Sequence, residues 1–447
     1  MMTLFDQKKY LKIFILLWVV LLILTCNSND QQPTLVNLSH LDHLYEEIIM
    51  DSIPAAIIHI YADYPDYKWV EATGEGIACV DDVARAAVFY LRHYQYVKEE
   101  ASLSKARKLL QFILDMQAAN GLFYNFIHAN HSINKTRHNS QPKADWWSWR
   151  AIWALGEAYP VFVQIDPDFS DKIDENIKET FPSIDSLVRH YPKTQQFEGF
   201  TQPNWLPLGG AADQTSELLL GLIPYYSSTL DSSIKPYILK LCDGLIKMQI
   251  GDSSNYPFGA FLTWQNTWHA WGNSQAEVLI RAGKVLNNES FIERGLREVR
   301  FFYPYILNEN FVRKITFRKE NKIFEPIEIQ KFSQIAYNIR PMVMASLAAY
   351  EVTGKEHFAE QAGKIACWFL GRNPADQLMY NLETGRCFDG INNPDVFNKN
   401  SGAESTIEAL LALLEVEKYD ISKKIANEFY QQRKVKVNTD LESVILR

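Results

Sequence analysis

Two adjacent carboxylates, Asp81 and Asp82, open the run VDDVARAAVFYL, which is otherwise largely apolar. Asp145, Asp213 and Glu404 stand at the starts of similar runs. Two carboxyl groups in one site can perform acid–base catalysis, because one protonates a leaving oxygen while the other activates water. A single acid at a helix start is explained more simply as a cap, and capping is the favoured interpretation of Asp145. One cap needs only one aspartate, so the pair Asp81/Asp82 points to chemistry.

Tryptophans gather around the same helix starts. Indole faces give large contact area with a polar handle and suit stacking on sugar rings. The tryptophans expected to hold sugar are Trp146, Trp147, Trp149, Trp205, Trp264, Trp268 and Trp271, whereas Trp153 and Trp368 are expected in the core. The polar residues expected beside them are Arg150, His269, Asn273 and Asp389.

The elements that must position these residues are six similar helical runs. Their starts are marked by Asp82, Asp145, Asp213, Asn273, Asn338 and Glu404, at intervals of 60 to 68 residues. Even spacing of this kind predicts a structural repeat. The runs are apolar nearly all round, so they are expected to be buried.

Between the runs lie amphipathic helical patterns at 103–117, 234–249 and 356–371. Six buried helices, each followed by a half-exposed one, predict an all-α fold of six helix hairpins closed into an (α/α)6 toroid. A superhelical stack of hairpins is the alternative. In a ring all six inner N-termini open on one rim, where long connections such as 120–147 and 251–273 are expected to carry function. Alternation within 309–332 predicts an inserted β-hairpin.

The N-terminus predicts export. Lys8, Lys9 and Lys12 precede an uncharged apolar run from Ile13 to Leu24, as in a signal peptide rather than a transmembrane helix. ILTC resembles a bacterial lipobox and implies lipidation of Cys26, although an ordinary secreted protein is the alternative. The expected organisation is a signal peptide at 1–25, a tether at 26–38 and a catalytic toroid at 39–447. The expected location is the bacterial envelope, anchored by lipid to the outer membrane and facing the periplasm or the cell surface.

Composition narrows the function further. The net charge is −8 and no stretch is dense in Lys or Arg, so nucleic acid is not an expected partner. Cys79, Cys242, Cys367 and Cys387 are widely spaced, which argues against zinc and leaves one or two disulfides open. Motifs of serine hydrolases, nucleotide-binding proteins and zinc proteases are missing from the sequence. We expect a monomer without cofactor or metal.

Several stretches resemble a known toroid. ACVDDVARA, NGLFYNFI, WSWRAIWALGEAY, WFLGRN, TGRCFDGI and NSGAESTIEALLALL resemble the six-hairpin toroid at the end of some bacterial mannan-associated glycosyltransferases, over most of the chain after residue 70. The chain has no nucleotide-sugar-binding α/β domain, so the resemblance does not imply transferase activity.

The segment WFLGRNPADQLMY is also similar to LGxNPxxxSY of glycoside hydrolase family 9, whose members are (α/α)6 toroids. In that family an aspartate in a D-x-G-D motif is the catalytic base, and a glutamate near the last inner helix is the acid. By position, Asp81/Asp82 and Glu404 correspond to these roles, although the chain has CVDD instead of D-x-G-D. The resemblance implies the fold and a carbohydrate site.

The sequence therefore predicts a glycoside hydrolase acting on an oligo- or polysaccharide, with an inverting mechanism. Glu404 is the expected acid and Asp82 the expected base, supported by Asp81 and Asp213. A polysaccharide lyase or sugar epimerase on the same scaffold is one alternative, with His128, His131 and His269 as proton-transfer groups. A non-catalytic glycan-binding lipoprotein is the other.

Overall fold

The computed structural model describes residues 34–321 and 323–445. The predicted signal peptide, the lipidation site Cys26 and most of the predicted tether lie outside these residues. The compact unit begins at Leu35, inside the segment expected to be a tether, because Leu35 is buried and its amide donates to Oε1 of Glu417 at 2.6 Å. Within the described ranges, no helix combines the length and apolar character that crossing a membrane requires.

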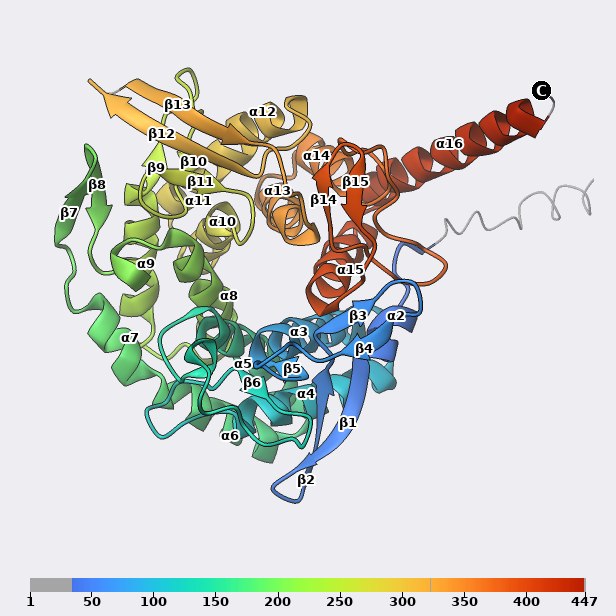
Figure 1. Cartoon of the computed structure of the whole chain (residues 1–447). Coiled ribbons are helices and arrows are strands. Elements are labelled where there is room, and N and C mark those ends of the chain that lie inside the picture. Colours follow the sequence, from blue (N-terminus) through green and yellow to red (C-terminus); the bar gives the residue numbers. More distant parts are fainter. Residues whose placement is uncertain (1–33, 322, 446–447) are drawn as a thin grey trace, which may run out of the picture. The chain divides into compact units, whose positions relative to one another are not determined.

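An inner ring of helices surrounds the centre of this unit (Figure 1). In the described residues its six members are α3 (Val80–Val97), α5 (Trp146–Ile165), α8 (Ala212–Thr229), α10 (Gln275–Leu286), α13 (Arg340–Thr353) and α15 (Ala403–Glu417). Each packs against the next in chain order, and α15 packs against α3, which closes the ring. The predicted (α/α)6 toroid is therefore confirmed, and the superhelical alternative is wrong.

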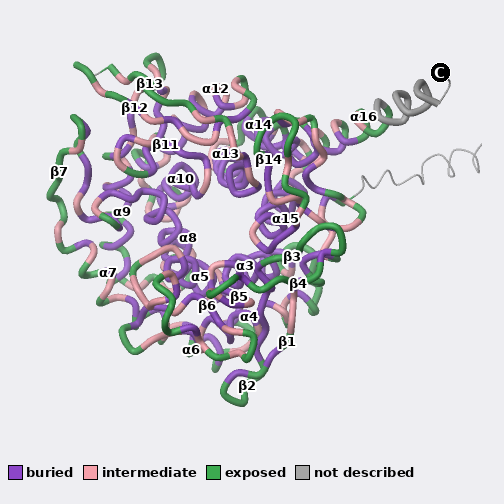
Figure 2. Tube along the Cα trace, viewed as in Figure 1, coloured by how far each residue is buried: buried purple, intermediate pink, exposed green. Residues whose placement is uncertain are grey.

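Outer helices follow the inner ones and cover them. They are α4 (Glu100–Asp115), α6 (Pro167–Glu179) with α7 (Phe181–Val188), α9 (Lys235–Lys247), α11 (Glu289–Arg297), α14 (Glu356–Ala366) and α16 (Asp420–Ile445). A π-helical turn, η3 (Glu298–Phe302), joins α11 to α12 (Tyr303–Asn308). The inner helices are buried along most of their length, whereas the outer helices alternate buried and exposed residues (Figure 2). This matches the apolar and amphipathic patterns in the sequence.

Two glycines set the close packing of α5 and α8. A Cβ on Gly156 would lie 2.1 Å from the carbonyl oxygen of Gly221, and a Cβ on Gly221 would lie 2.3 Å from that of Ile152. The two backbones therefore touch directly, and any larger residue would separate the helices.

Short strand pairs lie in the connections that precede the inner helices. In chain order they are β1 (Tyr45–Met50) with β2 (Ile53–Ile58), β3 (Tyr61–Asp63) with β4 (Lys68–Val70), β5 (Ala78–Cys79) with β6 (Phe126–Ile127), β7 (Thr194–Phe197) with β8 (Phe200–Pro203), β9 (Gln249–Ile250) with β10 (Ala260–Phe261), and β14 (Gly390–Asn393) with β15 (Val396–Asn398). The predicted hairpin is confirmed as β12 (Lys314–Glu320) and β13 (Ile323–Gln330), and β11 (Thr267–His269) extends it to three strands. The hairpins before α3 were not predicted. Helix α2 (Ser39–Leu44) and the 3-10 turns η1 (His138–Ser140), η2 (Pro207–Gly209) and η4 (Ala336–Asn338) complete the described elements.

The helix caps differ from the interpretation in which one of Asp81 and Asp82 caps its helix. Asp145 caps α5, because its side chain accepts from the amide of Trp146. Neither Asp81 nor Asp82 caps α3, whose N-cap is Cys79 without a side-chain cap bond. Neither aspartate therefore has a capping role.

The four cysteines of the described residues are all buried and free, so the disulfides left open by the sequence do not form.

Candidate active site

The starts of inner helices open into two adjoining cavities. The carboxylate cavity, of ≈ 330 Å³, is lined by Asp82, Asp389 and the residues around them. The tryptophan cavity, of ≈ 530 Å³, is lined by Trp146, Trp147 and Trp271 among others. Six residues line both cavities and make them continuous: Glu75, Asp81, Asn125, Phe126, Ile335 and Glu404.

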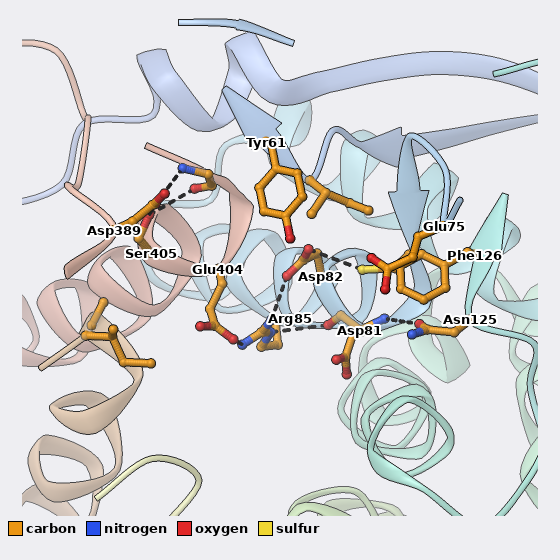
Figure 3. Close-up of a pocket in the computed structure, with 15 residues that line it drawn as sticks. Tyr61, Glu75, Asp81, Asp82, Arg85, Asn125, Phe126, Asp389, Glu404 and Ser405 are labelled. Atoms are coloured by element: carbon orange, nitrogen blue, oxygen red, sulfur yellow. Dashed lines mark hydrogen bonds and ion pairs between the residues drawn. The ribbon is translucent and has the colours of Figure 1, made fainter. Parts of the chain in front are cut away.

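Asp82 lines the carboxylate cavity and is 4% exposed. Its Oδ1 accepts from Nη2 of Arg85 at 2.6 Å, and its Oδ2 accepts from the thiol of Cys79 at 3.2 Å. Burial raises the pKa of Asp82 to about 6, although Arg85 opposes this shift. Figure 3 shows the hydroxyl of Tyr61 pointing toward this carboxylate. Asp82 therefore titrates close to neutral pH.

Glu404 faces Asp82 across the guanidinium of Arg85 (Figure 3). Every residue of α15 except Glu404 is buried, whereas the Glu404 side chain is 45% exposed. Its Oε2 accepts from Nη1 of Arg85 at 3.1 Å. Because one guanidinium holds both carboxylates, Asp82 and Glu404 are separated by the width of that group and two hydrogen bonds.

Asp81 belongs to the same site but is held by a second arginine. Arg150 donates to Oδ1 of Asp81 and, from Nη2, to the hydroxyl of Tyr337 at 2.7 Å. That hydroxyl donates in turn to Oε1 of Glu217 at 2.8 Å. Asp81 lines both cavities.

Buried charges beneath the site hold both arginines in place. Glu408 accepts from Nη1 of Arg85 at 3.2 Å and also from Nε of Arg340. Arg340 lies 3.6 Å from Glu217, which is 3.7 Å from Nε of Arg150. Since Arg340, Glu217 and Glu408 are at most 1% exposed, this network is rigidly enclosed.

Two further carboxylates line the site without an ion pair among the described residues. Glu75 accepts from Nδ2 of Asn139 at 2.7 Å. Asp389 accepts from the amide of Gly402 at 2.9 Å and from the hydroxyl of Ser405 at 2.7 Å, and burial raises its pKa. Carboxylates thus outnumber the arginines of the cavities.

Several tryptophans expected to hold sugar do line the tryptophan cavity. Trp146 lies under the guanidinium of Arg150, 5.0 Å from its ring centroid. Trp147 is mostly buried and donates from Nε1 to the carbonyl of Phe123 at 2.7 Å. Trp271 offers at most one free face, because His269 stacks on it at 3.6 Å with an interplanar angle of 7°.

The structure corrects the sugar-binding expectation for three tryptophans. Trp149, Trp205 and Trp268 have no exposed surface, so their rings cannot stack on a ligand. Their side chains pack in the core, where Trp149 donates to Gln214 and Trp205 to the carbonyl of Lys240. Trp264 is 42% exposed but lines neither cavity. Trp153 and Trp368 are buried, as expected.

Asp213 is not brought together with Asp82 and Glu404. Its Oδ2 lies 3.1 Å from Nε2 of His269, and both residues are buried outside the two cavity linings. Asn273 is also buried and donates to the carbonyl of His269 at 3.3 Å. Among the described lining residues of the two cavities there is no histidine, so His128, His131 and His269 lie outside the site.

Sequence reasoning missed Glu75, Arg85, Arg313 and Tyr337. Arg85 follows Asp82 by three residues, a spacing that places two side chains on one helix face and was available as a signal. Glu75 stands inside the same quoted run, but nothing in its spacing indicates that the loop folds back over the cavity. Within the described ranges, no group of His, Cys, Asp and Glu has the arrangement of a metal site.

Comparison with known proteins supports the toroid fold. No protein-family model matches this chain, and no curated protein sequence matches it. Solved structures do match. A cellobiose 2-epimerase from Bacillus thermoamylovorans B4167 has a TM-score of 0.58 at 14% identity, covering 81% of this chain and 92% of its own. A metagenome-derived glycoside hydrolase family 9 endoglucanase has a TM-score of 0.51 at 12% identity, covering 81% of this chain and 71% of its own.

A D-mannose isomerase has a TM-score of 0.51 at 11% identity, covering 76% of this chain and 86% of its own. Likeness at this level of identity concerns the fold, which hosts several kinds of sugar chemistry. What this chain does must therefore be inferred from its own cavities.

Proposed function

We propose that this protein is a glycoside hydrolase acting on an oligo- or polysaccharide. The observation that carries the proposal is the pair Asp82 and Glu404, two carboxylates of different burial held by one arginine at a cavity that continues into a tryptophan-lined cavity. Glycosidic bond cleavage requires two such groups at the scissile bond. The solved structures of similar fold include sugar-processing enzymes, which supports a carbohydrate substrate.

The two carboxyl groups differ in environment, since Asp82 is buried and Glu404 is half-exposed. Asp82, with its pKa raised to about 6, is a stronger base than an ordinary aspartate and is still mostly ionised at pH 7. As Asp82 takes a proton from water, the water oxygen bonds to the anomeric carbon and the glycosidic bond breaks. Glu404, open to both cavities, gives its proton to the leaving oxygen. The product then has inverted anomeric configuration.

A sugar epimerase or isomerase is the alternative within the same fold. Proton transfer at a sugar carbon next to a carbonyl needs a base and an acid, and carboxylates can serve there too. A glycosidase and an epimerase differ in product, because only the glycosidase releases a new reducing end.

The test is a panel of mannans, glucans, xylans and host glycans incubated with the purified protein. We expect new reducing ends from at least one glycan, with inverted configuration by NMR at early time points. Epimerised product without new reducing ends, or binding without any product, would overturn the proposal. A new absorbance from an unsaturated product would instead indicate a lyase.

We further propose export and lipid anchoring through Cys26, on the basis of the lipobox-like ILTC. Expression with a labelled fatty acid is expected to label the wild-type protein. Labelling that persists in Cys26→Ser contradicts this proposal.

A further inference from the structure

Three residues that the sequence singled out take no part in the proposed bond cleavage: Asp213, His269 and Trp271. They contact one another in that order, and the rings of His269 and Trp271 are stacked. Nε2 of His269 faces Asp213 at 3.1 Å, and Nδ1 of His269 faces the carbonyl oxygen of Trp271 at 2.8 Å. Both ring nitrogens therefore face oxygen acceptors, which fixes the imidazole plane parallel to the indole of Trp271. The stack gives Trp271 a fixed position in the tryptophan cavity.

A cationic side chain, that of Arg313, lies on this stack. The guanidinium of Arg313 lies over the ring of Trp271, 5.3 Å from its centroid. The backbone of Arg313 is fixed on both sides, since its amide donates to the carbonyl of Gln330 at 2.8 Å and its carbonyl accepts from Ala270 at 2.9 Å. An arginine stacked on an aromatic face keeps the N–H groups at its edge available.

The charge of Arg313 is not neutralised by its described neighbours. Nη1 donates to Oε1 of Gln330 at 3.0 Å and to the carbonyl of Phe332 at 3.5 Å, and both acceptors are uncharged. Within the described ranges, no carboxylate lies in ion-pair distance of Arg313. Arg85 and Arg150, the other arginines of the site, each contact two or more carboxylates.

The charges of the site are partly separated in space. Arg313 lines only the tryptophan cavity, Asp82 and Asp389 line only the carboxylate cavity, and Glu75, Asp81 and Glu404 line both. An anionic ligand group would be repelled by the carboxylates and attracted to Arg313. A glycan that spans both cavities would then carry its negative group at Arg313 rather than beside Asp82 and Asp389.

We propose that Arg313, held by Trp271, His269 and Asp213, is a subsite for an anionic substituent, and that the substrate is an acidic glycan with a carboxylate at this position. An Arg fork matches a carboxylate with two parallel hydrogen bonds. That the acidic glycan is a substrate rests on the proposed glycosidase function. Binding of the anionic group to Arg313 does not depend on cleavage.

The experiment measures binding to Glu404→Gln protein, so that ligand is not consumed. The probes are hexuronic-acid oligosaccharides, their carboxyl-reduced neutral counterparts, and sulfated oligosaccharides that have no carboxylate. We expect calorimetry to show about tenfold or tighter binding of the acidic form over the reduced form, as a charge-assisted hydrogen bond provides. Arg313→Gln is expected to remove this preference, and Arg313→Lys to retain part of it.

Arg318→Gln is the matched control, because it removes the same charge from β12, the strand that directly follows Arg313, where Arg318 is exposed and paired with Glu320 and Glu325. This variant is expected to keep the preference. Equal binding of acidic and reduced probes, absence of binding by any acidic probe, or a preference that survives Arg313→Gln overturns the inference. Binding of only the sulfated probe, lost in Arg313→Gln, keeps the anion subsite and replaces carboxylate by sulfate.

The two proposals fail separately. Release of reducing ends from neutral glycans alone keeps the glycosidase and rejects the acidic substrate. Arg313-dependent binding of acidic probes without cleavage of any glycan by the wild-type protein keeps the subsite and rejects the glycosidase.

Discussion

The two ends of the inner ring both hold a cavity lined by charged side chains, but the charges are balanced differently. At the end where the inner helices begin, Glu75 and Asp389 have no cationic partner among the described residues, and Asp82 shares Arg85 with two other carboxylates. The far cavity, of ≈ 390 Å³, is lined by residues from the other ends of the same helices. There each lining carboxylate has a cation within ion-pair distance: Glu157 pairs with Arg92, Glu351 with Lys284 and with Arg281, which also holds Glu277, and Glu415 with Lys418.

The pKa shifts follow this difference. Burial raises the pKa of Asp82 to about 6, because Arg85 only partly offsets it while Asp81 and Glu404 add to it. Burial also acts upward on Glu157 and Glu415, but the cations around them outweigh it and their pKa values are lowered. Burial and ion pairing thus occur at both ends, and an excess of carboxylates is what distinguishes the candidate active site.

The connections differ in the same way. At the far end, inner helices pass to outer helices through turns such as Asp166 between α5 and α6. At the other end, connections such as 116–145 and 367–402 return to the next inner helix and carry Asn125 and Asp389 into the site. Long connections of this kind usually hold functional residues on a rigid scaffold.

The sharpest test of the comparison replaces one carboxylate at each end. Glu404→Gln is expected to lower kcat by about 100- to 10,000-fold, the usual contribution of an acid–base group. Glu415→Gln, on the same helix but in the far cavity, is expected to leave kcat of the folded protein unchanged. Steady-state kinetics on a glycan found to be cleaved measures both. Full activity in Glu404→Gln removes it from the mechanism, and an equal loss in Glu415→Gln removes the distinction between the two ends.

The far end is expected to contribute to stability. Glu157→Gln leaves Arg92 without its carboxylate in a buried site, so we expect the free energy of unfolding to fall by about 3–5 kcal/mol. Urea unfolding followed by circular dichroism measures this change. Lys424→Gln, which removes one partner of an exposed pair with Glu428, is the control and is expected to change stability by less than about 0.5 kcal/mol. A loss below about 1 kcal/mol in Glu157→Gln contradicts a stabilising role.

The pH dependence of stability is expected to differ in sign between the ends. The folded-state pKa of Asp82 is raised from 3.8 to about 6, so its stabilising contribution is complete below pH 3.8 and is lost as pH rises through 6. The unfolding free energy of the wild type, minus that of Asp82→Asn, is therefore expected to fall between pH 4.5 and about 6.5.

For Glu157 the pKa is lowered from 4.5, so its contribution is present above that pH and is lost only at more acidic pH. The difference between wild type and Glu157→Gln is expected to stay constant from about pH 5.5 to 7. Urea titrations at each pH provide both curves. Parallel curves for the two variants would show that folding does not shift the pKa values of Asp82 and Glu157 in opposite directions.

In the same pH range kcat/KM is expected to fall as pH drops below about 6, because the base Asp82 becomes protonated.

The smallest expected effect separates two tryptophans on the same rim. Trp146→Ala is expected to raise KM by about two- to tenfold with little change in kcat, as loss of one aromatic contact would. Trp264→Ala, which is exposed but outside both cavities, is expected to leave KM unchanged. Equal effects of the two substitutions would mean that the tryptophan cavity does not bind the substrate.

Much of the scaffold was predictable, because a helix that is apolar all round must be buried by other helices. Six such runs at even spacing have one compact solution that buries them all, and α3 to α15 adopt it. The N-terminal hairpins β1–β4 were missed, since short strands that pack on the rim have no long periodic pattern to reveal them.

At the site, residue types indicated the pair Asp81/Asp82 and Glu404, because extra acids at helix starts exceed what capping requires. Which tryptophans face the cavity was not predictable, since Trp147 and Trp149 are two residues apart and differ in surroundings: Trp147 lines the tryptophan cavity, whereas Trp149 is enclosed in the core. Exposure depends on neighbouring elements distant in sequence, such as Gln214 of α8 beside Trp149.

By itself, then, the sequence determined the ring and the end of it that carries the carboxylates, because both follow from local periodicity and helix polarity. Only the tertiary structure decided that Arg85 joins α3 to Glu404 and Glu408 of α15, and that Arg313 keeps an unpaired charge above Trp271. Charge balance and pKa depend on distances between residues that can be hundreds of positions apart in the chain, and these distances exist only once the ring has closed.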